Sequence, residues 1–79
     1  MPTAYVLITS DLGSEENIIK DIRGIVDVKE VEGTYGVYDI IVKVESNSME
    51  ELKNTITWKI RKIPQVRSAI TLMVIEGQG

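Results

Sequence analysis

The chain has 79 residues, contains neither cysteine nor histidine, and carries a net charge of −3. This length allows one domain, residues 1–79, whose small core is marginal unless something adds to it. The missing residue types exclude disulfides, cysteine zinc sites and a histidine base, so we expect no metal, no cofactor and stabilisation by oligomerisation. The acids and bases are interspersed, which argues against a DNA-binding face. Because we find no membrane-spanning stretch and no secretory leader, we expect a cytoplasmic protein without membrane contact.

The first half of the chain predicts a strand, a helix and a second strand. Residues 4–9 are apolar or β-branched and end at a Ser-Asp turn signal, which indicates a strand. A helix follows, with Ser14 as its N-cap and Gly24 at its end, because the isoleucines between them share one helical face. Residues 26–31 predict the second strand, which turns at residues 33–36.

The second half repeats this order. Residues 37–44 predict a third strand, after which Ser48 and Glu51 form the Ser-x-x-Glu pattern of a capping box at the start of a second helix. Pro64 ends that helix, and residues 67–75 predict the last strand. The residues that we expect on the buried face of the second helix are Met49, Leu52, Ile56, Ile60 and Ile63.

The order strand–helix–strand–strand–helix–strand, with two similar halves, predicts an α+β domain of the ferredoxin-like type. In this fold four antiparallel strands form one sheet, and two helices pack on one of its faces. A glycine-rich tail at residues 77–79 is expected to fray after the last strand.

The first and last predicted strands are apolar on both of their sides. In the first strand, Tyr5 and Leu7 alternate with other apolar residues rather than with polar ones, and Ile70 and Leu72 do the same in the last strand. A strand with one face in water would alternate apolar and polar residues. The helices cover one face only, so we expect a second copy of the chain to cover the other by sheet-on-sheet packing. The alternative is that these residues are scattered exposed aliphatics without consequence.

The charged residues favour structural roles over catalysis. Two acidic pairs, at residues 15–16 and 50–51, fall in first helical turns, where the helix dipole favours acids. No serine or threonine has a histidine to activate it, so we expect no catalytic residue and no enzyme. A basic cluster either contacts phosphate or compensates the dipole at a helix end, and we prefer the second interpretation. That cluster consists of Lys59, Arg61, Lys62 and Arg67.

Trp58 is placed unusually for a tryptophan. At roughly 100° per residue, it lies opposite the buried face predicted for the second helix. Either it is partly buried against a long neighbour such as Lys62, or it is a contact anchor of the kind that is enriched at interfaces. The sequence leaves both interpretations open.

The segment from Gly33 to Asp39 is the most informative part of the chain. Gly33 and Gly36 allow positive φ angles and a close approach of the backbone to a ligand, with amide groups available to a carboxylate. Asp39 then places a carboxylate early in a strand that is otherwise apolar. The structural alternative is a simple hairpin turn in which Asp39 accepts hydrogen bonds from local amides.

The segment Gly36-Val37-Tyr38-Asp39, followed by Ile-Ile-Val-Lys-Val at residues 40–44, resembles the Gly-x-Tyr-Asp hairpin of the Lrp/AsnC effector domain, also called RAM. The similarity spans essentially the whole chain and continues through residues 49–52, 60–64, 66–68 and 71–75. Full-length members of that family carry an N-terminal helix-turn-helix. Because the first strand begins close to Met1, we expect a stand-alone RAM domain without direct DNA binding.

The resemblance implies the fold derived above, with sheets that pack into dimers and dimers that gather into rings. It implies amino-acid effectors bound between dimers, near the hairpin and the start of the last strand. The ligand-binding residues carried over are Gly36, Val37, Tyr38, Asp39 and Thr71. The family often has a hydroxyl two positions before that threonine, where this chain has Ala69.

Two functions follow as expectations. The first is a module that binds a small amino acid or related metabolite, oligomerises, and modulates amino-acid-linked transcription. The second is a ligand-free structural partner that co-assembles with full-length Lrp/AsnC-type regulators. An enzyme of the dimeric ferredoxin-like class is a distant third, since no acid–base constellation is visible.

Overall fold

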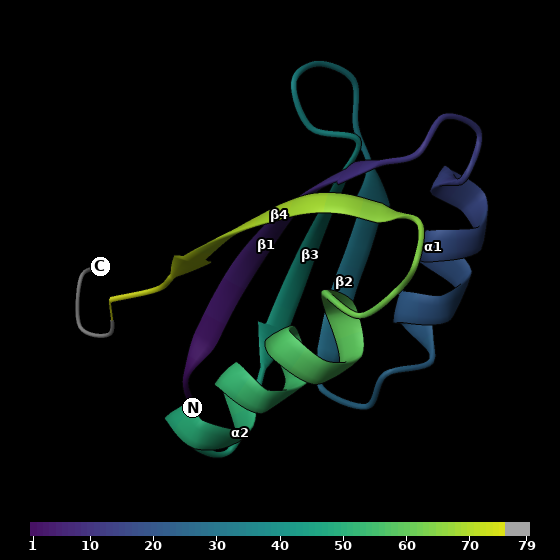
Figure 1. The fold of residues 1–79 in the computed structure, drawn as a ribbon. Coiled ribbons are helices and arrows are strands. Elements are labelled where there is room, and N and C mark those ends of the chain that lie inside the picture. The colour runs from purple at the N-terminus through teal and green to yellow at the C-terminus, as the bar shows by residue number, and fades with distance from the viewer. Residues whose placement is uncertain (76–79) are drawn as a thin grey trace.

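The computed structural model describes residues 1–75, and the tail expected at 77–79 lies outside them. The elements follow the predicted order, with a π-helical segment, η1, continuing directly from α2 (Figure 1). Their bounds are β1 Thr3–Ser10, α1 Glu15–Arg23, β2 Val28–Gly33, β3 Ile40–Glu45, α2 Met49–Asn54, η1 Thr55–Ile60 and β4 Val66–Met73.

The strands form one four-stranded sheet in the order β2-β3-β1-β4, and every neighbouring pair is antiparallel. In the middle of the sheet, Val6 of β1 pairs with Val42 of β3 and Thr71 of β4. Both helical segments lie on one face of this sheet (Figure 1). The ferredoxin-like fold expected from the sequence is therefore confirmed.

The core lies between that face and the helices. Alternate residues of β1 and β3 are buried, and the isoleucines and leucine of the helical segments pack against them. The buried hydrophobic residues are Ala4, Val6, Ile8, Ile18, Ile22, Val31, Ile40, Val42, Val44, Leu52, Ile56 and Ile60. Alternate residues of β1 and β3 thus face the core, and the residues between them face the other side of the sheet, as expected for a strand.

The prediction of a third strand over residues 37–44 was wrong at its start. The strand begins at Ile40, and the residues before it belong to a loop in which Gly36 has a φ of 117°. The loop is closed by the backbone N–H of Thr34, which donates to the carbonyl oxygen of Asp39 at 2.8 Å. Valine and tyrosine are residue types that favour strands, but Val37 and Tyr38 lie inside this closed loop. Pairing with the neighbouring strands therefore begins only after the loop.

The other strands differ from their predicted bounds by smaller amounts. The second strand runs from Val28 to Gly33 rather than over residues 26–31, and Val26 is exposed in the preceding turn. The last strand, predicted over residues 67–75, spans Val66–Met73.

The second helix begins as predicted, since the hydroxyl of Ser48 accepts a hydrogen bond from the backbone N–H of Glu51 at 3.2 Å. The predicted buried face was wrong at Met49, which is 45% exposed in the first turn. Ser14 precedes the first helix as predicted, but its side chain makes no capping hydrogen bond.

Candidate functional site

The predicted site residues 36–39 lie in the hairpin loop between β2 and β3. This loop and the loop after β1 project from the same end of the sheet (Figure 1). Within the described part of the chain, the backbone N–H groups of residues 35–38 donate no hydrogen bond. The side chains of Tyr35 and Val37 are exposed. The hairpin therefore presents free amide donors beside apolar side chains.

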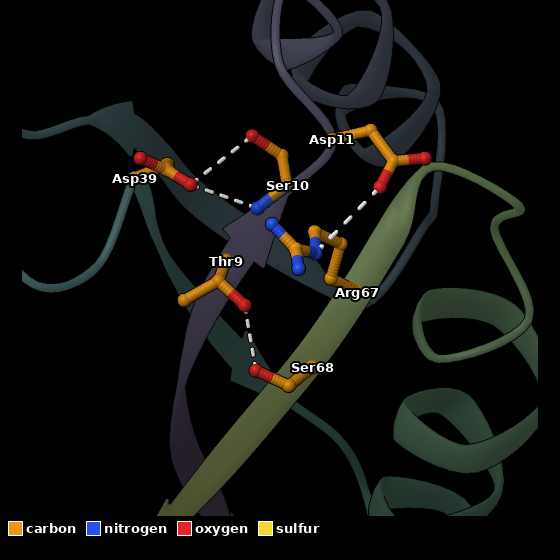
Figure 2. Close-up of polar contacts among 6 residues, drawn as sticks. All are labelled: Thr9, Ser10, Asp11, Asp39, Arg67 and Ser68. Atoms are coloured by element: carbon orange, nitrogen blue, oxygen red, sulfur yellow. Dashed lines mark hydrogen bonds and ion pairs between the residues drawn. The ribbon is translucent and has the colours of Figure 1, made fainter.

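Asp39 attaches this hairpin to the end of β1. Its Oδ2 atom accepts a hydrogen bond from the backbone N–H of Ser10 at 2.8 Å and another from the Ser10 hydroxyl at 3.2 Å (Figure 2). The backbone N–H of Asp39 donates to the carbonyl oxygen of Ile8 at 2.8 Å. Asp39 thus has a structural role, but its side chain accepts from Ser10 of β1 rather than from the local amides that the turn interpretation expected. Its Oδ1 atom accepts no hydrogen bond from residues 1–75 and remains available.

A surface cavity of about 440 Å³ adjoins the hairpin and is lined by Glu15, Gly33, Thr34, Tyr35 and Asp39. Sequence reasoning assigned Glu15 only to dipole compensation in α1 and did not include Thr34 or Tyr35 in the site. No spacing rule connects Glu15 with Asp39, because only the fold brings the start of α1 beside the hairpin. The cavity wall contains two carboxylates, those of Glu15 and Asp39.

Polar residues of β1 and β4 border the same end of the sheet. The Nε atom of Arg67 lies 3.9 Å from Oδ1 of Asp11, and the hydroxyls of Thr9 and Ser68 are 2.6 Å apart (Figure 2). Asp39 and Arg67 flank the Thr9–Asp11 segment on its β3 and β4 sides, respectively. This end of the sheet therefore carries a cation as well as carboxylates.

The basic cluster predicted from the sequence is divided among different partners. Arg67 pairs with Asp11, whereas a terminal nitrogen of Arg61 donates to the carbonyl oxygen of Ala69 at 2.7 Å. The ammonium of Lys62 lies 5.1 Å from the centroid of the Trp58 ring. These three contacts are not the dipole compensation that the preferred interpretation expected, whereas Lys59 does lie in the last turn of η1.

Thr71 lies apart from the hairpin within one chain. It pairs with Val6 in the middle of β1, and its side chain lines a cavity of about 260 Å³ beside α2 and η1. From the register, two strand spacings and three residues separate Thr71 from Asp39, which places their Cα atoms roughly 14 Å apart. The fold brings residues 36–39 together but does not bring Thr71 to them.

The other face of the sheet carries an apolar patch. Tyr5 of β1 pairs with Leu72 of β4, and Leu7 pairs with both Ile70 of β4 and Ile41 of β3. Ile70 is 44% exposed and Leu72 is 50% exposed. We name this patch, Tyr5, Leu7, Ile41, Ile70 and Leu72, the open face.

Within residues 1–75, no group of three or more metal-ligating side chains is present. None of the helices in the described range is long and apolar enough to cross a membrane.

Comparison with known proteins identifies relatives of this fold and the family of the chain. Among solved structures, FFRP-DM1 is 37% identical with a TM-score of 0.92, and the match covers 95% of this chain and 100% of that one. E. coli AsnC is 23% identical with a TM-score of 0.89, over 99% of this chain and 53% of AsnC. A Neisseria meningitidis transcriptional regulator in complex with L-Met is 12% identical with a TM-score of 0.85, over 99% of this chain and 52% of the regulator.

The two regulators show likeness of fold alone, and the chain spans about half of their length. No curated protein sequence matches the chain. The family model described as the Lrp/AsnC ligand binding domain matches residues 3–77, which is nearly the whole sequence. The chain therefore belongs to the Lrp/AsnC ligand-binding domain family, as the Gly-x-Tyr-Asp hairpin indicated.

Proposed function

We propose that the chain binds a small amino acid or a related metabolite at the hairpin of residues 36–39. The observation that carries this proposal is the free Oδ1 atom of Asp39 beside four backbone N–H groups that have no partner among residues 1–75. A free amino acid presents an ammonium and a carboxylate a few ångströms apart. The Asp39 carboxylate suits the ammonium, and the amides of the loop suit the carboxylate.

The proposal includes a dimer formed by packing the open face against that of a second copy. Each of these five residues has an apolar side chain, and together they span the three adjacent strands β3, β1 and β4. A chain of 79 residues buries a small core by itself, so burial of this patch adds stability that the monomer lacks. Isologous packing of two sheets is a common way to supply such a layer.

Assembly of dimers completes the site in this proposal. The hairpin cavity is open to solvent, and Tyr35 in its wall, Val37 in the same loop and Leu12 in the loop after β1 have exposed side chains. A neighbouring dimer docked on these side chains would exclude water from the ligand and bring a second chain, with its Thr71, toward Asp39. Binding would then stabilise one form of the assembly over another and so modulate transcription. Because such regulation acts on the chromosome, the cytoplasm is the expected location.

A second candidate function has its own supporting observation. Asp39 already accepts two hydrogen bonds from Ser10, so its presence in the hairpin is explained without a ligand. In that case the chain is a structural partner that co-assembles with full-length Lrp/AsnC-type regulators. The DNA-binding helices of such a mixed assembly would come from the partner.

Calorimetric titration of the assembled protein with the twenty amino acids separates these functions. The Asp39→Asn variant keeps an oxygen that can accept from Ser10 but loses the negative charge. We expect it to bind the effector roughly thirty- to a hundred-fold more weakly, because a charge-assisted hydrogen bond is lost. Asp21→Asn, at an exposed site on α1, is the matched control and leaves binding unchanged.

If Asp39→Asn binds the effector as tightly as wild type does, the ligand does not bind at the hairpin. Absence of binding for all twenty amino acids, combined with formation of mixed oligomers with a full-length regulator, would favour the structural partner instead.

A further inference from the structure

A second surface cavity lies at the opposite end of the sheet from the hairpin. It has a volume of about 440 Å³, within the roughly 300–1,000 Å³ of small-molecule sites, and lies between the turn before β2 and the helical segments. Its lining residues are Asp27, Glu51, Asn54, Thr55, Trp58 and Lys59. It belongs to the helical layer, so a dimer formed through the open face leaves it accessible.

Asp27 is a fixed anion in this cavity. Its Oδ2 atom accepts hydrogen bonds from the buried hydroxyls of Ser46, at 2.7 Å, and Thr55, at 3.0 Å. The Ser46 bond is the main cause of a lowered pKa of Asp27, with Thr55, Lys59 and Lys29 acting in the same direction and burial opposing them. The carboxylate is thus ionised and held in one orientation, while Oδ1 accepts no hydrogen bond within residues 1–75.

Trp58 supplies a flat apolar surface beside this anion. It lies in the π-helical segment, where the N–H of Arg61 donates to the carbonyl oxygen of Ile56, five residues earlier, at 2.9 Å. Such segments occur frequently at functional sites. The residue stays 63% exposed even though the ammonium of Lys62 lies 5.1 Å from the ring centroid. The contact with Lys62 is the one that the first interpretation of Trp58 expected, and the large exposed area leaves the second, a contact anchor, as a prediction.

The remaining polar groups of the cavity make no direct polar contact with other described residues, although Lys59 acts on Asp27 through its charge. Within the described part of the chain, the side chains of Glu51, Asn54 and Lys59 make no hydrogen bond or ion pair. The cavity thus combines acidic acceptors, one ammonium donor and an indole plane. A ligand that matches all three carries an ammonium, a carboxylate and a flat apolar group.

We propose that this cavity binds a zwitterion of the aromatic amino-acid class, at a site separate from the hairpin. The ligand ammonium binds Oδ1 of Asp27, with Glu51 nearby, and the ligand carboxylate binds the Lys59 ammonium. The aromatic ring of the ligand packs on Trp58, whose stacking with another ring adds to the burial of apolar area. The proposal does not depend on the function proposed for the hairpin.

Trp58 is the single tryptophan of the chain and lines this cavity, so its fluorescence reports on the surroundings of the cavity. The test is a titration of the assembled protein with three probes that share one ring: L-phenylalanine, phenethylamine without the carboxylate, and 3-phenylpropionate without the ammonium. We expect a saturable change with L-phenylalanine, a several-fold weaker response with phenethylamine, and none with 3-phenylpropionate. The absence of a saturable change with L-phenylalanine, or an equal response to 3-phenylpropionate, overturns the proposal.

Substitutions in the cavity wall provide a second test. Lys59 and Glu51 are exposed, so replacing them should not unfold the protein. Lys59→Met and Glu51→Gln should each weaken L-phenylalanine binding about 2- to 10-fold, as expected for one partly solvated charge-assisted contact. Asp39→Asn should leave the Trp58 response unchanged, even if it abolishes effector binding at the hairpin. Wild-type binding by both cavity variants, or loss of the response in Asp39→Asn, contradicts a separate site.

Discussion

Both faces of the sheet carry apolar residues in β1 and β4, but only one face is covered by the helices, and the other also carries the Lys43–Glu30 ion pair. In β1, Ile8 points toward the helices and is fully buried, whereas its neighbour Leu7 points to the open face and is only partly covered. In β4, Ile70 and Leu72 are as apolar as core residues but are 44% and 50% exposed. β1 and β4 therefore carry apolar residues on both of their sides, and the chain itself covers only one of these sides. This is why we propose a second copy as the cover of the other.

The largest expected effect comes from the helix-covered face. Ile8→Ala should lower the free energy of unfolding by about 2–5 kcal/mol, because it leaves a cavity in a fully packed core. The effect should not depend on protein concentration, as urea unfolding at several concentrations will show. Leu7→Ala, one residue away on the other face, is the matched comparison. Its effect should shrink as dilution favours the monomer, in which the open face is exposed in wild type and variant alike, and a loss independent of concentration would weaken the distinction between the faces.

A smaller loss of stability is expected at Asp27, whose carboxylate connects the turn before β2 with Thr55 of the helical layer. Asp27→Ala leaves the buried hydroxyls of Ser46 and Thr55 without their acceptor, which costs on the order of 1–3 kcal/mol. The folded-state pKa of Asp27 is lowered from its ordinary value of 3.8, so its stabilising charge is fully present above that pH. That contribution is lost as the pH falls through the lowered pKa.

The pH dependence gives this prediction a sharper form. Asp27→Asn retains an oxygen acceptor but has no charge to titrate. Its deficit in unfolding free energy relative to wild type should be present at pH 7 and shrink below about pH 4. Asp21→Asn, at an exposed position, provides the control. A deficit for Asp27→Asn that stays constant down to pH 2 would show that the charge of Asp27 does not contribute.

The sequence predicts the fold well because periodicity directly reflects burial. The alternation in β1, the N-cap at Ser48 and the isoleucines of the helices are all local patterns, and each has its expected place. The exposure of Met49 was not predicted. The residue lies in the first turn of α2, and the core does not extend to that turn. The start of β3 was misplaced because Val37 favours a strand by type, whereas the closure of the hairpin loop determines where pairing begins.

The candidate site was predicted less completely, because its members come together only in three dimensions. Residues 36–39 are consecutive and were found by their motif, but Glu15 reaches the same cavity from another element. Likewise, Asp27 meets Ser46 and Thr55 from positions 19 and 28 residues away. No sequence pattern encodes such contacts.

Dimer formation through the open face can be tested directly by measuring the mass of the protein in solution. Sedimentation equilibrium of the wild-type chain and of Leu72→Asp, from nanomolar to micromolar concentration, gives the mass of each. We predict a wild-type mass of at least twice 8.8 kDa at micromolar concentration and a folded or partly unfolded monomer for Leu72→Asp, since an unpaired charge would be buried at the interface. A wild-type mass of 8.8 kDa throughout, or a Leu72→Asp variant that assembles as wild type does, would contradict the second layer.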